Sequence, residues 1–388
     1  MTCPYQQTCG GCPYRNLDLA DYKKLKNEQF CRIISQLNQE NIKTGAPIFI
    51  ADGTRRRAEL AFKHNRGNLV LGFNECKSHE IINIENCPLL TPKINKVIPQ
   101  LRTFLSEFCN IKVSEKLKNK KFRTYNIGGG DIWLTEAVNG VDTLLEINEP
   151  LSLEHRMALC DFANKTEDIT RISVQAGNSK PETVIEKSRP YLNIGGYQVF
   201  IPAGTFLQAS NSGEQALINL VLKYIGDSQG NIADLFCGVG TFSYPLAANP
   251  KNKITAIDSS DELLNGFQKS VNHNTIPNIK ICRKNLFKYP LDTNELKGFD
   301  IVVFDPPRAG AAAQTAQLSA MPDEDKPQKV IAVSCNPHTF VNDANTLISG
   351  GYRIIEITFV DQFVYSTHSE LVALFEKTIG EKNEYRTA

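Results

Sequence analysis

Short apolar runs alternate with more polar, helix-like segments in the second half of the chain. Most of these runs are rich in β-branched residues and are bounded by polar or turn-forming residues, as is typical of buried strands. The predicted strands are 232–236, 254–258, 279–282, 300–304, 329–334, 353–359 and 371–376. Because strands and helices alternate in this way in α/β proteins, the pattern predicts a doubly wound parallel sheet.

The first half of the chain follows a different pattern. Residues 22–37 have the spacing of apolar residues that is typical of an amphipathic helix, and residues 151–164 are also predicted to be helical. Apolar and polar residues alternate elsewhere, with a turn predicted at 64–67 and a sharp break at glycines 128–130. The predicted strands are 58–63, 68–73, 125–127, 132–137 and 197–201.

The change of pattern near residue 204 predicts two domains, a β-rich α+β domain at 1–204 and an α/β domain at 205–388. The chain is 41% hydrophobic and 22% charged, which is typical of globular proteins. It does not begin with a signal peptide, and no apolar run approaches the ~20 residues that span a bilayer. These features predict a cytoplasmic protein, and none of them predicts an obligate protein partner.

The formal net charge is only +1, so a polyanionic partner would have to bind a local basic group. Two such groups occur, one around Arg55, Arg56 and Arg57 and the other between Lys112 and Arg123. Three adjacent arginines before a predicted strand favour contacts with RNA phosphates. The second group fits a solvated surface equally well.

Three cysteines lie close together near the N-terminus, at Cys3, Cys9 and Cys12. Cys76 and Cys87 are candidates for a fourth ligand, and Cys87 is preferred because a proline follows it, as in many iron–sulfur motifs. Four thiolates suit a [4Fe-4S] cluster or a structural zinc ion, and their spacing does not distinguish the two. The alternative is an N-terminal tail in which the cysteines have no joint function.

Polar residues follow the predicted strands of the second half. A glycine-rich turn, Cys237 to Phe242, comes after the first strand. The next three strands end in or are followed by Asp258, Asn285 and Asp305-Pro306-Pro307-Arg308. Ligands bind at the carboxyl ends of the strands in such sheets. A simple dinucleotide-binding domain is one alternative, but the third glycine of its motif is absent. In this order, the motifs resemble a class I methyltransferase dependent on S-adenosylmethionine (SAM), with its Rossmann-like doubly wound sheet.

Cys335 follows another apolar run, 330–333, within Ser-Cys-Asn-Pro. By itself, this position suits a nucleophile or a small buried residue equally well. Two further motifs flank the methyltransferase-like region, Phe206-Leu207-Gln208 before it and His368-Ser369-Glu370 after it. Taken in order along nearly the whole chain, these motifs resemble the RNA 5-methyluridine methyltransferase family.

The resemblance implies a SAM-dependent enzyme that methylates C5 of a uracil in RNA. It implies that Cys335 adds to C6 of the base and that Glu370 removes the C5 proton. It further implies that the uridine leaves its stack to enter the pocket. The residues expected to line the cofactor and uracil pockets are Gln208, Phe236, Gly238, Asp258, Asn285 and Asp305. The expected ligands of a [4Fe-4S] cluster are Cys3, Cys9, Cys12 and Cys87.

Three residues depart from the family pattern: Ser210 and Ser366 replace an asparagine and a threonine, and Val364 replaces a proline. The chain starts at the cysteines, without the N-terminal RNA-binding β-barrel of some relatives. This arrangement resembles the iron–sulfur enzymes that act on 23S rRNA. The alternatives are methylation of the TΨC-loop uridine of tRNA, cytosine-5 methylation, and a non-catalytic RNA-binding iron–sulfur protein.

Overall fold

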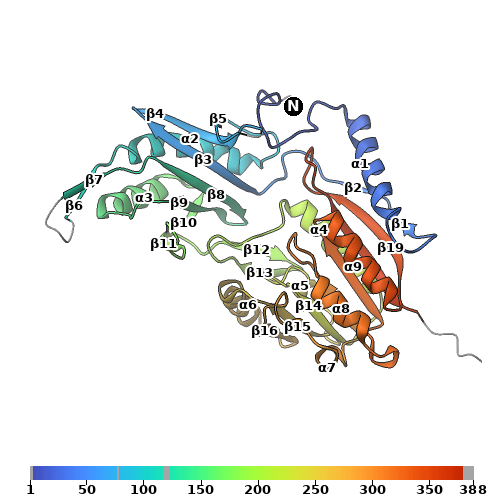
Figure 1. Ribbon diagram of the computed structural model, residues 1–388. Helices are drawn as coiled ribbons and strands as arrows, with labels where there is room; N and C mark the ends of the chain where they lie inside the picture. Colours follow the sequence, from blue (N-terminus) through green and yellow to red (C-terminus); the bar gives the residue numbers. More distant parts are fainter. Residues whose placement is uncertain (1–2, 77, 117–121, 379–388) are drawn as a thin grey trace, which may run out of the picture. The chain divides into compact units, whose positions relative to one another are not determined.

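The computed structural model describes residues 3–76, 78–116 and 122–378, which form two compact units (Figure 1). The predicted basic residues at 117–121 lie outside the described part. Each unit combines three segments of the chain. Unit 1 contains the N-terminal segment as far as Leu19, then Ile50–Glu214 and Gln362–Thr367. Unit 2 contains Ala20–Phe49, Gln215–Asp361 and the segment from His368 onward.

Unit 1 is built on a seven-stranded sheet with the order β11-β10-β9-β8-β3-β4-β5. Its strands are β3 (Arg57–Asn65), β4 (Asn68–Asn74), β5 (Ile81–Asn83), β8 (Gly129–Ala137), β9 (Gly140–Ile147), β10 (Ile169–Ala176) and β11 (Glu182–Glu186). The helices α2 (Pro92–Phe108) and α3 (Leu153–Lys165) bury apolar side chains against the sheet. Two hairpins complete the unit: β6 (Val113–Lys116) with β7 (Phe122–Tyr125), and β12 (Tyr191–Ile194) with β13 (Tyr197–Phe200).

The break predicted at glycines 128–130 is only partly confirmed, because residues 126–128 separate β7 from β8 but β8 begins at Gly129 and runs through Gly130. A Cβ atom at residue 130 would overlap the backbone carbonyl oxygen of Glu146 on β9. Glycine is therefore needed here for the close approach of a neighbouring strand, and it does not end the element.

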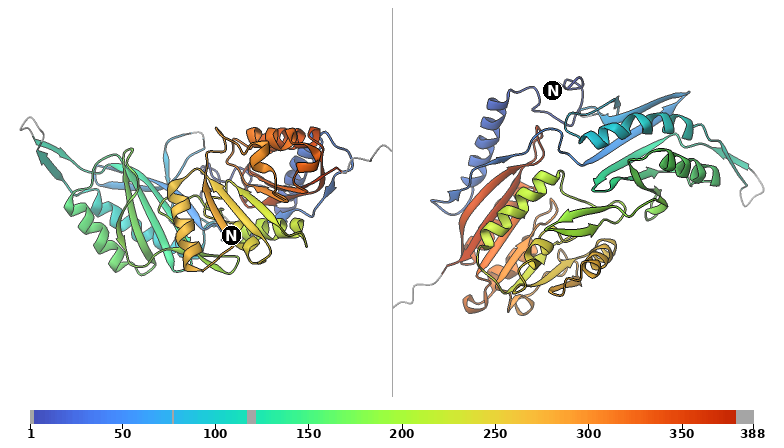
Figure 2. Two further views of the ribbon diagram at one scale, coloured as in Figure 1. Left: turned by 90° about the horizontal axis from the view of Figure 1, so that it is seen from below. Right: turned by 180° about the vertical axis from the view of Figure 1, so that it is seen from behind.

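Unit 2 contains a nine-stranded sheet with the order β1-β19-β20-β18-β17-β14-β15-β16, in which β2 also pairs with β19 (Figure 2). The strands are β1 (Lys43–Thr44), β2 (Ile48–Phe49), β14 (Asn231–Leu235), β15 (Lys253–Asp258), β16 (Ile279–Arg283), β17 (Ile301–Phe304), β18 (Lys329–Ser334), β19 (Tyr352–Asp361) and β20 (Glu370–Lys377). Apolar runs at the predicted positions form the seven longer strands, and their side chains fill the core.

Unit 2 also contains helices, and those that follow β14 connect its parallel strands. The helices are α1 (Leu19–Ile34), α4 (Asn211–Ile225), α5 (Ser243–Ala247), α6 (Asp261–His273), α7 (Thr293–Leu296), α8 (Ala312–Ala320) and α9 (Pro337–Ser349), with a 3₁₀ turn at Asp323–Asp325. Helix α1 lies beside the β19 end of the sheet (Figures 1 and 2), where the ring centroids of Phe30 and Phe359 are 5.8 Å apart. Residues 20–49 therefore pack with unit 2. A division of the chain at 204/205 would instead assign them to the first domain.

The sheet is mixed, although the pattern of the chain predicts a wholly parallel one. Strand β20 runs antiparallel to both of its neighbours, β18 and β19. A parallel neighbour requires a long crossover, usually through a helix, whereas only residues 362–369 separate β19 from β20. The reversal brings the first residue of β20 beside the last residue of β18.

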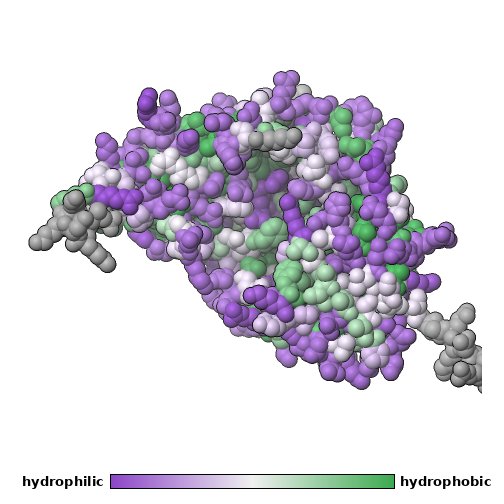
Figure 3. All heavy atoms as spheres, viewed as in Figure 1, coloured by the Kyte–Doolittle hydropathy of each residue, from purple (hydrophilic) through white to green (hydrophobic). Residues whose placement is uncertain are grey.

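Two surface properties of the described residues bear on the setting of the protein. Within this part of the chain, every helix is too short or too polar to cross a lipid bilayer. On the face shown in Figure 3, hydrophilic side chains cover most of each unit, and the hydrophobic ones occur in small groups.

Candidate active site

The end of β18 delivers Cys335 to a position beside Glu370. Ser334 pairs with Leu371 in the antiparallel register of β18 and β20, so the next residue along each strand towards the loop is Cys335 on one and Glu370 on the other. Glu370 is buried, with 3% of its surface exposed, whereas Cys335 is half-buried. The thiol and the carboxyl group of the predicted catalytic pair therefore lie together in unit 2.

The surroundings of Cys335 favour the protonated thiol. Burial raises the pKa of Cys335 to about 12, and the negative charges of Glu370 and Asp305 add to this effect. The positive charge of Arg308 acts in the opposite direction. A thiolate at this position therefore needs its proton removed and its charge balanced as the substrate binds.

Arg308 links the loop that follows Cys335 to the segment that precedes Glu370. Its Nη2 atom lies 3.0 Å from Nε2 of His368. Its backbone carbonyl accepts a hydrogen bond of 2.8 Å from the side-chain amide of Asn336. The exposed arginine of the Asp-Pro-Pro-Arg motif thus contacts residues within two positions of both members of the predicted catalytic pair.

The glycine-rich turn after β14 has a left-handed backbone at three positions, with φ of +60° at Phe236, +55° at Gly238 and +95° at Gly240. A Cβ atom at residue 240 would lie 2.6 Å from the ring of Phe267, which explains the second glycine. Gly238 donates its backbone N–H to Oδ2 of Asp258 at 3.1 Å. The turn is thereby fixed to the end of the neighbouring strand.

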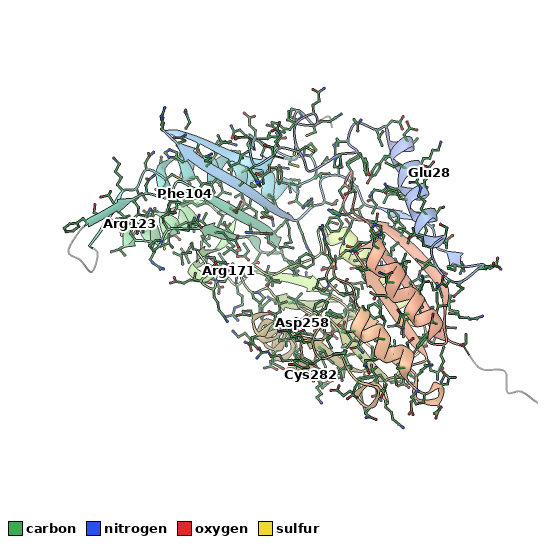
Figure 4. All side chains as sticks on the ribbon, viewed as in Figure 1. Glu28, Phe104, Arg123, Arg171, Asp258 and Cys282 are labelled. Atoms are coloured by element: carbon green, nitrogen blue, oxygen red, sulfur yellow. The ribbon has the colours of Figure 1, made fainter. Side chains whose placement is uncertain are left out.

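Asp258 ends β15 and Asn285 follows β16, the next strand in the sheet. Figure 4 labels Asp258 together with Cys282, the residue of β16 that pairs with Ile257. Oδ1 of Asn285 accepts backbone hydrogen bonds from Phe287 and Lys288 and so shapes the turn after β16. Within unit 2, the predicted residues Phe236, Asp258, Asn285, Asp305 and Cys335 all lie at the carboxyl ends of five adjacent strands.

Beneath the glycine turn, Asp234 on β14 is fully buried. Burial raises the pKa of its carboxyl group to about 7, although Ser243 donates a hydrogen bond to Oδ2. Its Oδ1 atom has no hydrogen-bond partner among the described residues. Such an acceptor is expected to meet a donor from a bound molecule or water.

Gln208 belongs to unit 1, where it is 7% exposed. Its Oε1 atom accepts a hydrogen bond of 2.7 Å from Nε2 of Gln362, which orients the amide. The backbone of this segment is held by two arginines: Nε of Arg56 donates to the carbonyl of Gln208, and Nη1 of Arg57 donates to that of Leu207.

The assignment of the three arginines to phosphate contacts is wrong for Arg56. This side chain is buried and forms two hydrogen bonds, of 3.1 and 2.7 Å, with the carboxylate of Glu214. Arg57 is half-buried, and its guanidinium carbon lies 5.1 Å from the ring centroid of Phe206. Both arginines support the Phe-Leu-Gln segment from within unit 1.

The four predicted cluster ligands line one small cavity in unit 1. Cys3, Cys9, Cys12 and Cys87 share this cavity with apolar side chains that include Phe73, Ile84 and Leu89. Burial raises the pKa of Cys12 to about 12, and the nearby thiols of Cys87 and Cys9 raise it further. Cys76 is exposed and does not line the cavity. In the described part of the chain, no three His, Cys, Asp or Glu side chains are arranged as a metal site.

Comparison with known proteins identifies the family. The model of the family described as tRNA (uracil-5-)-methyltransferase matches residues 22–378. An uncharacterised RNA methyltransferase of Agrobacterium fabrum is 34% identical over 95% of this chain and 82% of its own length. The chain belongs to the RNA (uracil-5-)-methyltransferase family. It is a SAM-dependent enzyme of that class.

Two further matches have named substrates. The 23S rRNA (uracil(1939)-C(5))-methyltransferase RlmD of Pectobacterium atrosepticum is 28% identical over 97% of this chain and 80% of its own length. The crystal structure of the Pyrococcus abyssi tRNA (uracil-54, C5)-methyltransferase with S-adenosyl-L-homocysteine covers 97% of this chain and 87% of its own, with a TM-score of 0.72 and 23% identity. The second match shows that the methyltransferase has the fold of that protein.

Two buried residues that contact Asp361 or His368 have no functional role in the sequence predictions: Tyr22 and Lys26. Lys26 lies four residues before Phe30 and four after Tyr22, so it continues the apolar face of α1. A lysine on an apolar helix face is a signal that could have singled out Lys26, because lysine is almost never fully buried unless it is paired.

Proposed function

We propose that this methyltransferase forms 5-methyluridine in RNA through a covalent adduct between Cys335 and C6 of the uracil. The proposal rests on the pairing of β18 with β20, which sets the thiol and the carboxyl of Glu370 side by side. Addition of the thiolate makes C5 nucleophilic. SAM, when bound, supplies an electrophilic methyl group. Glu370 then accepts the C5 proton, and the thiolate leaves as the C5–C6 double bond re-forms.

Charge also supports these roles. Arg308 is the positive group that lowers the pKa of Cys335, so it favours the thiolate at the moment of addition. Glu370 is buried beside the same sulfur, where a carboxylate can reach C5 of a base bonded to it. The two groups would thus serve opposite ends of one reaction, addition and elimination.

The test of this mechanism is Cys335→Ser, with Cys282→Ser on the same sheet as the matched control. The first variant should lose turnover and the covalent RNA adduct that survives denaturing electrophoresis, and the second should retain both. Turnover by the Cys335→Ser variant would refute the covalent mechanism.

For the cofactor, we propose that Phe236, Gly238, Asp258, Asn285 and Asp305 bind SAM. They lie at adjacent strand ends, and the left-handed turn leaves open space where a side chain at Gly238 would point. The buried, unpartnered oxygen of Asp234 fits a hydrogen-bond donor on the cofactor. The variant Asp258→Ala should weaken SAM binding measured by calorimetry, because it also frees the glycine turn.

The substrate that we propose is 23S rRNA, with the TΨC-loop uridine of tRNA as the alternative. The RlmD relative is named for a 23S uracil, and the cysteine group of this chain resembles the iron–sulfur enzymes of that type. The relative of known structure is named for tRNA. Mapping 5-methyluridine in both RNAs, in cells with and without the gene, decides between them. Loss of the modification from neither RNA would refute both of these substrates.

We propose further that Cys3, Cys9, Cys12 and Cys87 hold a [4Fe-4S] cluster. A cubane places its own atoms between the thiolates, so its ligands lie farther apart than those of one zinc ion. Four thiols that line one cavity could supply the four cysteine ligands of such a cluster. Anaerobically purified protein should contain iron and acid-labile sulfide, both lost on Cys87→Ser but not on Cys76→Ser. Stoichiometric zinc without iron would refute the cluster.

A further inference from the structure

A lysine from the N-terminal helix is buried beside the strand that carries Glu370. Lys26 on α1 has no exposed surface. Its Nζ atom donates a hydrogen bond of 2.7 Å to the backbone carbonyl of His368 and lies 3.2 Å from Oδ1 of Asp361. Tyr22, one turn earlier on the same helix face, donates its hydroxyl to Oδ2 of Asp361.

These contacts join two points that bracket the connection between β19 and β20. Asp361 is the last residue of β19, and His368 lies two residues before Glu370, the first residue of β20. Val360 pairs with Glu370 across the two strands. Lys26 therefore holds the entry to β20 by its backbone, immediately before the carboxylate that faces Cys335.

The burial of this ammonium group is costly, so its charge needs an explanation. Burial lowers the pKa of Lys26, and the charge of Asp361 counteracts that shift. An apolar side chain of the same length would pack against Phe359, whose ring centroid lies 6.0 Å from Nζ, without this penalty. Unlike methionine, lysine can donate hydrogen bonds to a carbonyl and a carboxylate at the same time.

The segment around His368, which Lys26 contacts through the backbone, also has side-chain contacts. The imidazole of His368 lies 3.0 Å from Arg308, and the Arg308 carbonyl accepts from Asn336, the neighbour of Cys335. His368 is thus fixed through its backbone by Lys26 and through its ring by Arg308. Only the second of these contacts belongs to the motifs of the active site.

We propose that Lys26 is a positioning residue for Glu370, and that it acts on the elimination step and not on methyl transfer. The inference rests on the proposed function of Glu370. In that step the C5–H bond breaks and its proton passes to the carboxylate. The electron pair forms the C5–C6 double bond, the C6–S bond breaks, and the sulfur leaves as the Cys335 thiolate. A base displaced by even a fraction of an ångström slows this step.

The experiment compares Lys26→Met with Lys24→Met, an exposed lysine on the same helix. Single turnovers use RNA tritiated at C5 of the uridines and SAM labelled in its methyl group. Tritium release reports elimination, and methyl label on RNA reports transfer. In Lys26→Met, tritium release should slow by about 10- to 100-fold. This is less than the loss expected on removing the general base itself, because Glu370 is still present. Methyl transfer should stay within about threefold of the wild-type rate. The methylated Cys335–RNA adduct should then accumulate, while Lys24→Met matches the wild type.

Reference variants separate the possible failures. Glu370→Gln should accumulate the same methylated adduct, and if it does not, the proposed role of Glu370 fails. If Glu370→Gln accumulates the adduct and folded Lys26→Met does not, only the inference on Lys26 is overturned. If Lys26→Met slows methyl transfer and elimination equally, the inference is also overturned, because Lys26 then has only a structural role. Lys26→Arg should restore elimination in part.

A fold-neutral variant covers the case in which Lys26→Met does not fold. Tyr22→Phe removes only the hydroxyl that holds Asp361, so no buried charge is left alone. It should keep the melting temperature close to that of the wild type and slow tritium release by about threefold, with the adduct detectable. If Lys26→Met does not fold and Tyr22→Phe accumulates no more adduct than the wild type, the inference is overturned.

Discussion

The reactivity of Cys335 towards an alkylating reagent is a direct measure of the charges around it. Burial and the charges of Glu370 and Asp305 raise the pKa of its thiol from the usual 9.0 to about 12. At pH 8 this lowers the fraction of thiolate about 1000-fold. A more basic thiolate is also more nucleophilic, and this raises its alkylation rate about 20-fold. Without ligands, Cys335 should therefore react with iodoacetamide about 50-fold more slowly than an ordinary cysteine. Its rate should still rise with pH above 9.

The informative perturbation is Glu370→Gln, which removes the largest of the charges that raise this pKa. Each unit by which the pKa of Cys335 falls should speed alkylation about threefold at pH 8, although turnover is lost. The matched control is Glu376→Gln, near the other end of β20, which should leave the rate unchanged. Arg308→Met should slow alkylation, because Arg308 is the charge that lowers the pKa.

The assay follows the Cys335 peptide by mass spectrometry between pH 7 and 10, since the chain has 11 cysteines and bulk thiol titration would mix them. Two results would refute the reasoning. One is a rate for Glu370→Gln equal to or below that of the wild type. The other is a plateau of the wild-type rate near pH 9, which would mean that neither burial nor the carboxylates shift the thiol.

Three further predictions concern stability. Glu214→Ala leaves its buried arginine partner uncompensated and should lower the free energy of unfolding by about 3–5 kcal/mol in urea titrations, whereas Glu182→Ala, at an exposed pair, should cost about 1 kcal/mol or less. Gly130→Ala should disrupt unit 1 and lower the melting temperature, while Gly128→Ala, with open space around it, should not. Asp234 stays protonated in the folded chain up to its pKa of about 7 but ionises near 3.8 when unfolded. The free energy of unfolding should thus fall by about 3 kcal/mol from pH 4 to 7, and Asp234→Asn should flatten that slope.

The seven longer strands of unit 2 could be predicted from sequence because each is a mainly apolar segment that ends at polar or turn-forming residues. The direction of β20 could not, since apolar periodicity is the same in parallel and antiparallel strands. Only the short connection at 362–369 indicates the reversal. The adjacency of Cys335 and Glu370 follows from that reversal, so the resemblance predicted what the pattern alone did not.

Unit 1 was predicted less completely, for reasons visible in its residues. Strand β9 is buried but contains Asp142, whose carboxylate pairs with Arg171 on the neighbouring β10 at 2.8 and 2.7 Å. Charges that are satisfied across strands interrupt the apolar pattern on both. Helix α2 has clear helical periodicity, but Pro92 and Pro99 within it obscured the element.

The network around Lys26 could not be found by reading motifs in order, because its members are more than 300 residues apart in the chain. Sequence periodicity marks which face of α1 is buried, but it does not name the partner of a lysine on that face. The pairing of residues 43–44 and 48–49 with β19 brings the N-terminal segment to this end of the sheet.

The membership of residues 20–49 in unit 2 has a consequence for synthesis on the ribosome. Helix α1 emerges early, yet β19, the strand it packs against, ends at Asp361, close to the end of the chain. The intervening segment 50–214 has its own core and can fold first. The apolar face of α1 must therefore wait, uncovered, until nearly the whole polypeptide has been made, and this helix is where a chaperone or an aggregating neighbour would first bind a nascent chain.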